Sequence, residues 1–210
     1  MSSASDQEPL DGRTALVTGG TGGIGYQTAR TLARGGAQLI ITGREAEAGE
    51  RAAAAIRRES GQASVTFLQA DHATVAGNRQ LAEQIQATFP DLRVLVNNVG
   101  GLYSTRWETA DGYEATLAMN LVGPYALTAE LLPLLRASAP SRFVNVVSAG
   151  FKMWKTDPFT DVQSLDRFVS GDAYAHTKLL NVLATSPVPD GSRQTRSRST
   201  WSTPACPGRR

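Results

Sequence analysis

The strongest constraint on the fold is an alternation along the chain between short apolar runs and longer amphipathic patterns. The apolar runs have the length of β-strands and cover residues 14–18, 38–42, 64–69, 92–97 and 142–148. Such runs are apolar on both faces, which predicts strands buried on both sides of a parallel sheet. The chain of 210 residues is long enough for one domain of this kind. We therefore expect a doubly wound α/β fold.

Amphipathic helical patterns fill the stretches between these runs. Apolar residues recur there three or four positions apart among Ala, Arg, Glu, Gln and Leu, which predicts helices. The predicted helices cover 24–34, 45–59, 75–89 and about 112–136, and a last one carries Tyr174 and Lys178. We expect one domain over residues 12–184, preceded by a flexible N-terminus over 1–11.

The last 26 residues break the alternation. Twenty of them are Ser, Thr, Pro, Gly or Arg, so we expect a disordered tail over 185–210. Five Arg and one Asp make this tail basic. A nucleic-acid-binding protein would need a basic face with aromatic residues in its folded part. The pattern shows no such face, and we expect no nucleic-acid partner.

A glycine-rich stretch, Thr-Gly-Gly-Thr-Gly-Gly-Ile-Gly at 18–25, lies between the first predicted strand and helix. Glycines there let the backbone approach a pyrophosphate, and a helix N-terminus offers unpaired amides and a partial positive charge. An ordinary glycine-rich turn is the simpler interpretation. We predict a dinucleotide site whose candidate residues are Thr18, Gly19, Thr21, Gly23, Ile24 and Gly25.

The second predicted strand ends in Thr-Gly-Arg44, where a site for NAD usually has an Asp or Glu that binds the adenosine ribose. The Arg44 guanidinium suits a 2′-phosphate through charge-assisted hydrogen bonds, and no carboxylate repels that phosphate. We therefore predict NADP(H) over NAD(H). The alternative is an exposed Arg that begins a helix.

Polar residues also follow the third and fourth strands. Asp71 can bind the adenine amine, and it can equally cap the next helix. Asn97, Asn98 and Gly100 end the fourth strand, where amides can hold loop backbone or cofactor. Because ligands bind at the carboxyl ends of parallel strands, we assign Asp71, Asn98 and Gly100 to the cofactor site.

Tyr174 and Lys178 lie four residues apart and therefore on one face of a helix. Hydride transfer to a carbonyl needs a proton donor, and Tyr174 is the candidate. The Lys178 ammonium favours the phenolate and can hold the nicotinamide ribose. Ser148, at the end of the fifth strand, can hold the substrate oxygen. Asn120 can bind a water that feeds protons to Lys178, although alone it also fits an ordinary helical amide.

Other chemistries fit less well. His72 and His176 have no accompanying carboxylate pattern that would make a metal site, so we expect no metal. The single cysteine, Cys206, allows no internal disulfide, which fits a reducing compartment. A Ser-His hydrolase is disfavoured because Ser148 lacks the flanking glycines of a nucleophile elbow.

The N-terminus has neither the basic start nor the apolar stretch of a secretory signal. No run approaches the roughly 18 apolar residues that cross a bilayer. We expect a soluble cytoplasmic protein with no membrane span.

Together these motifs resemble the short-chain dehydrogenase/reductase family over roughly residues 12–184. The motifs are the glycine stretch at 18–25, Asn-Asn-Val-Gly at 97–100, Asn120, Ser148 and Tyr-x-x-x-Lys at 174–178. The resemblance implies a Rossmann-type sheet, NAD(P)(H), reversible oxidation of alcohols to carbonyls, and often dimers or tetramers. It also implies a catalytic tetrad of Asn120, Ser148, Tyr174 and Lys178.

The gap of 26 residues between Ser148 and Tyr174 is similar to that of the retinol dehydrogenase and WW-domain oxidoreductase branch. So is the run Tyr-x-x-x-Lys-Leu-x-Asn-Val-Leu at 174–183. Apolar side chains in this gap either line an apolar substrate pocket or pack the loop. They are Phe151, Met153, Trp154 and Phe159.

Members of the family usually continue past the Tyr/Lys helix into a sixth strand, a substrate-binding segment and a last strand, which the pattern lacks after about residue 184. A frameshift or premature stop in a GC-rich gene would produce such a change. We expect an unpaired sheet edge and an incomplete substrate pocket as a result, which also weakens the expectation of a homo-oligomer.

Two readings compete with an active oxidoreductase. One is a non-catalytic nucleotide-binding remnant or inactive truncated product of such an enzyme. The other is a sugar-nucleotide epimerase, which also uses Tyr-x-x-x-Lys but usually has a different glycine spacing and a larger C-terminal domain.

Overall fold

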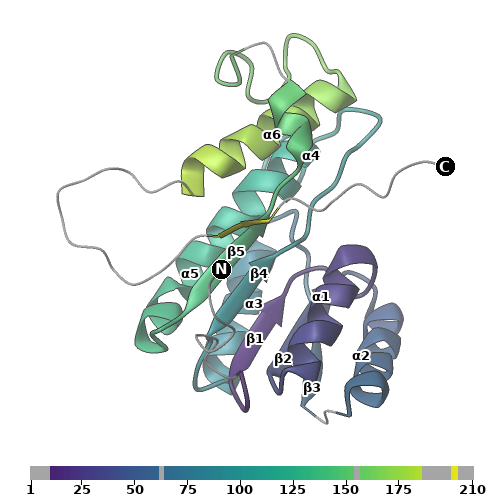
Figure 1. The fold of residues 1–210 in the computed structure, drawn as a ribbon. Coiled ribbons are helices and arrows are strands. Elements are labelled where there is room, and N and C mark those ends of the chain that lie inside the picture. Colours follow the sequence, from purple (N-terminus) through teal and green to yellow (C-terminus); the bar gives the residue numbers. More distant parts are fainter. Residues whose placement is uncertain (1–9, 62–63, 154–156, 186–199, 203–210) are drawn as a thin grey trace, which may run out of the picture.

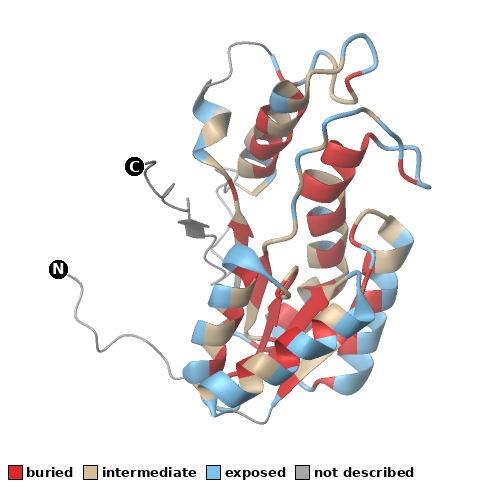
Figure 2. Ribbon diagram, turned by 90° about the vertical axis from the view of Figure 1, so that its right-hand side faces the viewer, coloured by how far each residue is buried: buried red, intermediate tan, exposed pale blue. Residues whose placement is uncertain are grey.

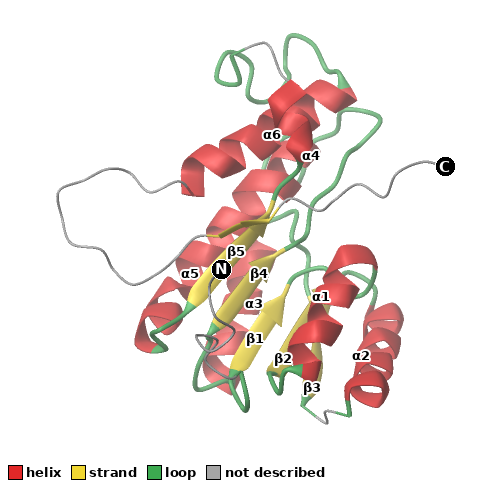
Figure 3. Cartoon of the chain, viewed as in Figure 1, coloured by secondary structure: helices red, strands yellow, loops and turns green. Residues whose placement is uncertain are grey.

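The computed structural model describes residues 10–61, 64–153, 157–185 and 200–202. In these residues six parallel strands form one sheet with helices on both faces (Figures 1 and 3). The strands are β1 (Thr14–Val17), β2 (Gln38–Gly43), β3 (Val65–Gln69), β4 (Val94–Asn97), β5 (Arg142–Val146) and β6 (Thr200–Ser202). The predicted doubly wound α/β fold is confirmed.

The strand order is β3-β2-β1-β4-β5-β6, so the direction of winding reverses between β1 and β4. At such a reversal the loops that leave neighbouring strands diverge and open a crevice beyond the carboxyl ends. The loops after β1 and β4 carry the glycine stretch and the Asn-Asn-Val-Gly motif. The topology therefore brings the two motifs to one crevice.

β6 corrects the sequence analysis, which expected no strand after residue 184. Thr200–Ser202 pairs in parallel with Val144, Asn145 and Val146 of β5. A Thr-Trp-Ser run has no apolar period, but pairing with an open strand edge uses only backbone groups and needs none. The edge of β5 is thus paired over three residues.

Two helices cover each face of the sheet. α1 (Gly23–Arg34) and α2 (Ala46–Ser60) pack on one face, and α3 (Val75–Thr88) and α5 (Gly123–Ala137) pack on the other (Figure 1). Each face has its own apolar cluster. Their positions agree with the helical patterns in the sequence.

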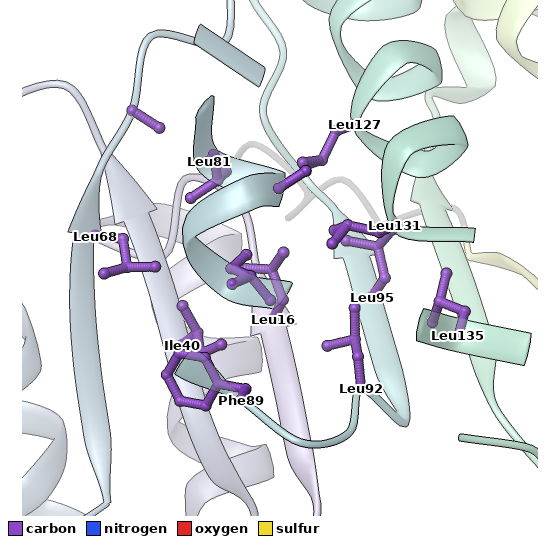
Figure 4. Packing of buried hydrophobic residues seen from close by; sticks show 13 residues of the cluster. Leu16, Ile40, Leu68, Leu81, Phe89, Leu92, Leu95, Leu127, Leu131 and Leu135 are labelled. Atoms are coloured by element: carbon purple, nitrogen blue, oxygen red, sulfur yellow. The ribbon is translucent and has the colours of Figure 1, made fainter. Parts of the chain in front are cut away.

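The two clusters alternate along each strand, because successive side chains of a strand point to opposite faces. In β1, Ala15 and Val17 join the cluster under α1 and α2, and Leu16 joins the cluster under α3 and α5. Figure 4 shows Leu16 in one cluster with Leu81 of α3 and Leu127 of α5. The central strands are buried (Figure 2), as runs that are apolar on both faces predict.

The long helix predicted over about 112–136 begins later and is not uniform. It consists of α4 (Ala115–Leu117), a π-helical turn η2 (Ala118–Val122) and α5. The buried carboxylate of Glu114 accepts hydrogen bonds from the amides of Thr116 and Leu117, both at 2.8 Å, which sets the start. A short 3₁₀ helix, η3 (Ala149–Met153), and α6 (Ser170–Thr185) complete the described elements.

One helical run among the described residues, Ala115–Ala137, is long and apolar enough to cross a membrane by length and composition. The run is not uniformly apolar, since it contains Asn120, Glu130 and Arg136, and the expectation of no membrane span stays a prediction. Part of the run is core: Leu127, Leu131 and Leu135 belong to the cluster under α3 and α5. Because a core helix meets the same criterion, the run is weak evidence for a membrane span.

Candidate active site

The glycine loop leaves β1 and leads into α1 without a capping side chain. Gly19 and Gly23 have φ angles of +64° and +54°, which residues with a side chain rarely adopt. The N-cap of α1 is Gly22, which has no side chain to cap the helix, and the first turn holds no acidic residue. Open space surrounds the positions where a Cβ would stand on Gly22 and Gly23. α1 therefore turns an uncompensated positive end toward the crevice.

Asn98, after β4, holds this loop in place. Its Nδ2 donates to the carbonyls of Thr18 at 2.9 Å and Gly19 at 3.3 Å. The Thr18 hydroxyl in turn accepts hydrogen bonds from the backbone amides of Asn98 and Val99, at 2.9 and 3.0 Å. A Cβ on Gly25 would collide with the Gly19 carbonyl and with Asn98 Nδ2. Only glycine fits this contact between helix and loop.

The remaining residues predicted around the loop lie at its outer side. Ile24 is 50% exposed, and the methyl group of Thr21 lies against Gly43 at the end of β2. Arg44 follows Gly43 directly and is exposed. Its carbonyl accepts a hydrogen bond from Gln69 Nε2 at 2.8 Å, which ties the ends of β2 and β3 together. Arg44 thus stands at the carboxyl end of β2.

Asp71 follows β3 and is exposed. Its Oδ1 accepts a hydrogen bond from the amide of Ala73 at 3.0 Å. The N-cap of α3 is Thr74, whose hydroxyl accepts from the amide of Gly77 at 3.1 Å. The alternative that Asp71 caps this helix was therefore wrong: it closes a turn three residues earlier.

Asn120 is fully buried in the π turn η2 and joins three segments. Its Oδ1 accepts from the amide of Gly101 at 3.0 Å, and its Nδ2 donates to the Gly101 carbonyl at 2.8 Å and to Thr177 Oγ1 at 3.1 Å. Its own carbonyl accepts from Asn181 Nδ2 at 2.7 Å. The loop after β4 is thereby fastened to η2 and α6.

Lys178 is the buried cation of the site, with 5% of its surface exposed. Its Nζ donates to the carbonyl of Val146 at 3.1 Å and lies 5.7 Å from the centre of the half-buried Tyr174 ring. Burial lowers the pKa of Lys178 to about 8. A Cβ on Gly100 would lie 2.6 Å from Asn120 Oδ1 and 3.0 Å from Lys178 Nζ. Four of the predicted residues thus converge.

Ser148 lies just beyond β5, where η3 begins and packs against α6. Its hydroxyl accepts a hydrogen bond from the amide of Gly150 at 3.2 Å. It stands at the same carboxyl edge of the sheet as the other three members of the predicted tetrad. In the loop that follows, Phe159 is 63% exposed, while Trp154 and the side chains of Phe151 and Met153 lie outside the described part.

Two contributors were missed by sequence reasoning, and one candidate points elsewhere. Thr177 and Asn181 hold Asn120 from α6, and the signal was available: both are polar residues within three positions of Lys178.

Asn97 donates to Thr128 Oγ1 and Asn145 Oδ1, both at 2.8 Å. It therefore ties β4 to α5 and β5, and only its neighbour Asn98 holds the glycine loop. Within the described ranges, no three His, Cys, Asp or Glu gather as metal ligands would.

The doubly wound sheet has a crevice at its switch point, with Tyr174, Lys178 and Asn120 beside it. This arrangement points to the class of dinucleotide-dependent oxidoreductases. A sequence model described as short chain dehydrogenase matches residues 13–156. The chain belongs to this family.

Its relatives place it near the retinol dehydrogenase branch. It is 40% identical to retinol dehydrogenase 12 of Homo sapiens over 176 residues, which cover 84% of this chain and 55% of the relative. It is 42% identical to dehydrogenase/reductase SDR family member 13 of Homo sapiens over 179 residues, with 83% and 46% covered. Identity to polyprenol dehydrogenase of Mus musculus is 40%, with 81% and 52% covered. The chain spans about half the length of these relatives.

Solved structures agree on the architecture. The Pseudomonas aeruginosa RhlG/NADP active-site complex is 30% identical, with a TM-score of 0.68 over 85% of this chain and 68% of that one. A metagenomic short-chain oxidoreductase in complex with NADP has a TM-score of 0.74 over 94% and 84%, at 24% identity, which bears on the fold alone. The predicted Rossmann-type sheet is confirmed.

Proposed function

We propose that the chain binds NADP(H) and interconverts an alcohol and a carbonyl, with Tyr174 as acid and base. One observation carries the proposal. Tyr174, Lys178, Asn120 and Gly100 converge at the carboxyl edge of the sheet, beside the loop that opens α1. The proposed proton donor therefore lies in the same crevice as the proposed dinucleotide site.

The residues around the glycine loop fit a dinucleotide. The loop has room at Gly22 and Gly23, and α1 offers uncapped amides and no acidic side chain to a pyrophosphate. Asp71 and Asn98 would serve the adenosine side, and Lys178 would hold the nicotinamide ribose. The full set for the cofactor is Thr18, Gly19, Thr21, Gly23, Ile24, Gly25, Arg44, Asp71, Asn98, Gly100, Tyr174 and Lys178.

The cofactor, when bound, supplies hydride to a carbonyl or accepts it from an alcohol. Tyr174 donates a proton from its hydroxyl to the oxygen of the carbonyl and takes that proton back in the reverse direction. Lys178 remains charged at neutral pH, because its pKa of about 8 still lies above 7. Its charge beside the ring stabilises the phenolate that proton donation leaves.

Ser148 and Asn120 support this exchange from two sides. The Ser148 hydroxyl, at the end of β5, can donate a hydrogen bond to the substrate oxygen while it accepts from Gly150. Asn120 positions the loop after β4 beside Lys178 through Gly101. A water held by Asn120 that feeds Lys178 stays a prediction.

Arg44 supports NADP(H) over NAD(H). It is exposed directly after β2, and within the described residues its guanidinium has no hydrogen bond or ion pair that a 2′-phosphate would have to displace. Gly43, the residue before it, ends β2 without a carboxylate. The solved complex of the related RhlG contains NADP, which agrees with this choice.

The substrate we propose is an apolar alcohol or its carbonyl. Two relatives are named for retinol and polyprenol, both apolar alcohols, and the exposed Phe159 lies in the loop between Ser148 and Tyr174. A cytoplasmic location and a homo-oligomer, expected from the sequence and from the resemblance, stay predictions.

The test is a titration of the purified protein with NADPH and NADH by tryptophan fluorescence, followed by NADPH consumption with a panel of apolar aldehydes and ketones. We expect Tyr174→Phe to lower turnover by roughly 10²- to 10⁴-fold, because it removes the proton donor, and to weaken NADPH binding far less, because the rest of the cofactor set remains. Binding without turnover in the wild-type chain would identify a non-catalytic nucleotide-binding remnant. Equal turnover in wild type and Tyr174→Phe would remove Tyr174 from the mechanism.

A further inference from the structure

A buried histidine outside the proposed chemistry links α3 to the glycine loop. His72, 4% exposed, lies just after β3. Its Nδ1 is 2.9 Å from Asn78 Oδ1 of α3, and its Nε2 is 2.7 Å from Thr42 Oγ1 of β2. Thr42 and Asn78 are both fully buried. No step of the proposed reaction uses this cluster, and no solvent competes for its hydrogen bonds.

The direction of each hydrogen bond follows from the fixed donors. Asn78 Nδ2 donates to two carbonyls, those of His72 at 3.2 Å and Thr74 at 2.7 Å, so its other amide atom is the oxygen. That oxygen can only accept, and His72 must carry its proton on Nδ1. In a neutral ring Nε2 is then an acceptor, and the Thr42 hydroxyl donates to it.

Thr42 connects His72 to the glycine loop through further hydrogen bonds. With its proton committed to His72, the Thr42 oxygen presents lone pairs, and the amide of Gly19 donates to it at 3.3 Å. The Thr42 carbonyl accepts from the amide of Gly20 at 3.1 Å. Gly19 has a φ of +64°, and the two hydrogen bonds to Thr42 help to hold the loop in this conformation. The chain Asn78, His72, Thr42, Gly19 thus runs from α3 to the proposed pyrophosphate site.

We propose that His72, as the neutral Nδ1-protonated tautomer, is a positioning residue that orients the glycine loop for the cofactor through Thr42. The proposal rests on the proposed function for its ligand, but the tautomer and the hydrogen-bond direction do not.

The surroundings of the ring agree with a neutral histidine. Burial lowers the pKa of His72, and the hydrogen bond to Asn78 and the charge of neighbouring Asp71 oppose this only in part. Thr42, Asn78 and the start of α5 at Gly123, which comes close to the His72 carbonyl, bring no charge to the ring. A second proton, on Nε2, would face the Thr42 hydroxyl proton and leave that proton without its acceptor.

Two variants separate the two ends of the ring. The amide of His72→Asn can replace Nδ1 toward Asn78 but cannot reach Thr42. The longer His72→Gln can place an amide oxygen near Nε2 and accept from Thr42. His72→Asn removes two non-hydrogen atoms from the buried site and His72→Gln removes one, so packing alone costs the Asn variant more stability. A purely structural residue would change the free energy of unfolding without a selective change at the Gly19 amide.

The measurements are the ¹⁵N spectrum of the two histidines, with His176→Gln for assignment, hydrogen exchange at the Gly19 amide, and the NADPH dissociation constant. We expect a protonated Nδ1 and an unprotonated Nε2 at pH 7. We expect His72→Asn to speed Gly19 exchange and weaken NADPH binding by about five- to tenfold, and His72→Gln to stay within about twofold of wild type in both.

Each contrary result is decisive. A proton on Nε2 at pH 7 would contradict the proposed direction of the hydrogen bonds from Asn78 to Gly19. Equal losses of Gly19 protection and NADPH affinity in the two variants would mean that His72 only packs the core. If the wild-type chain fails to bind NADPH, the proposed function fails, while the tautomer and Gly19 exchange still decide whether His72 orders the loop.

Discussion

Strands β1 and β2 differ from strand β5 in how completely they are buried. All four residues of β1 and four of the six in β2 are buried, whereas in β5 only Asn145 is. Beside β5 an apolar groove opens between α5 and α6, lined by Tyr125, Phe143 and Asn181 among others. β1 and β2 thus lie in a closed sandwich, and α6, which carries Tyr174 and Lys178, lies beside a thinly covered strand. Cofactor binding should therefore tolerate more damage at β5 than at β1.

The two candidate cations, Arg44 and Lys178, also differ in exposure. Arg44, after β2, is exposed, whereas Lys178, on α6, is buried and donates a hydrogen bond to the carbonyl of Val146. Exposure keeps the charge of Arg44 inexpensive and available to a ligand. Burial makes the charge of Lys178 unfavourable for folding and lowers its pKa to about 8, close to neutral pH.

The largest effect we predict comes from this buried charge. In the unfolded chain Lys178 titrates near 10.4, and in the fold its pKa is about 8. Between these two values the unfolded state binds more protons, so stability rises with pH across that window. Relative to Lys178→Met, the free energy of unfolding of wild type should rise by about 3 kcal/mol from pH 7.5 to 10.5.

Urea unfolding at several pH values measures this difference. Lys152→Met is the control, because it removes a lysine from an exposed position in η3 and should change the pH dependence far less. A constant difference between wild type and Lys178→Met over the window would mean that Lys178 is solvated, and the contrast with Arg44 would disappear.

The second prediction compares the same substitution in β1 and in β5. Val17 of β1 is fully buried, and Val146 of β5 only partly, although both contact the cluster under α1 and α2. Val17→Ala should cost about 2 kcal/mol of unfolding free energy, from two lost methyl groups and a cavity, and Val146→Ala less than about 1 kcal/mol. Urea unfolding at pH 7 compares the two. Equal costs would show that the β5 edge is as well packed as the centre.

The same contrast explains what could be predicted from the sequence. Five strands and the helices between them follow from apolar periodicity, which is local, and the loops at 18–25 and 97–100 follow from glycine and amide motifs. The π turn at Asn120 and the short strand β6 were not predicted, because each depends on partners far along the chain. The cap by Glu114 is local, but Glu is not among the residues preferred as an N-cap. His72 had no local signal either: only its contacts with Thr42 and Asn78 distinguish it from an ordinary core residue.

The smallest predicted effect tests the exposed cation. Arg44→Ala should weaken NADPH binding roughly tenfold, about 1.4 kcal/mol, and leave NADH binding nearly unchanged, because only NADPH carries the 2′-phosphate that the guanidinium would pair with. Arg51→Ala, another exposed arginine on α2, is the matched control and should change neither constant. Fluorescence titration at two salt concentrations adds a check, since an exposed charge pair weakens as salt rises. A parallel loss of NADH and NADPH binding in Arg44→Ala would mean that Arg44 shapes the loop after β2 rather than selecting the phosphate, and the preference for NADP(H) would lose its support.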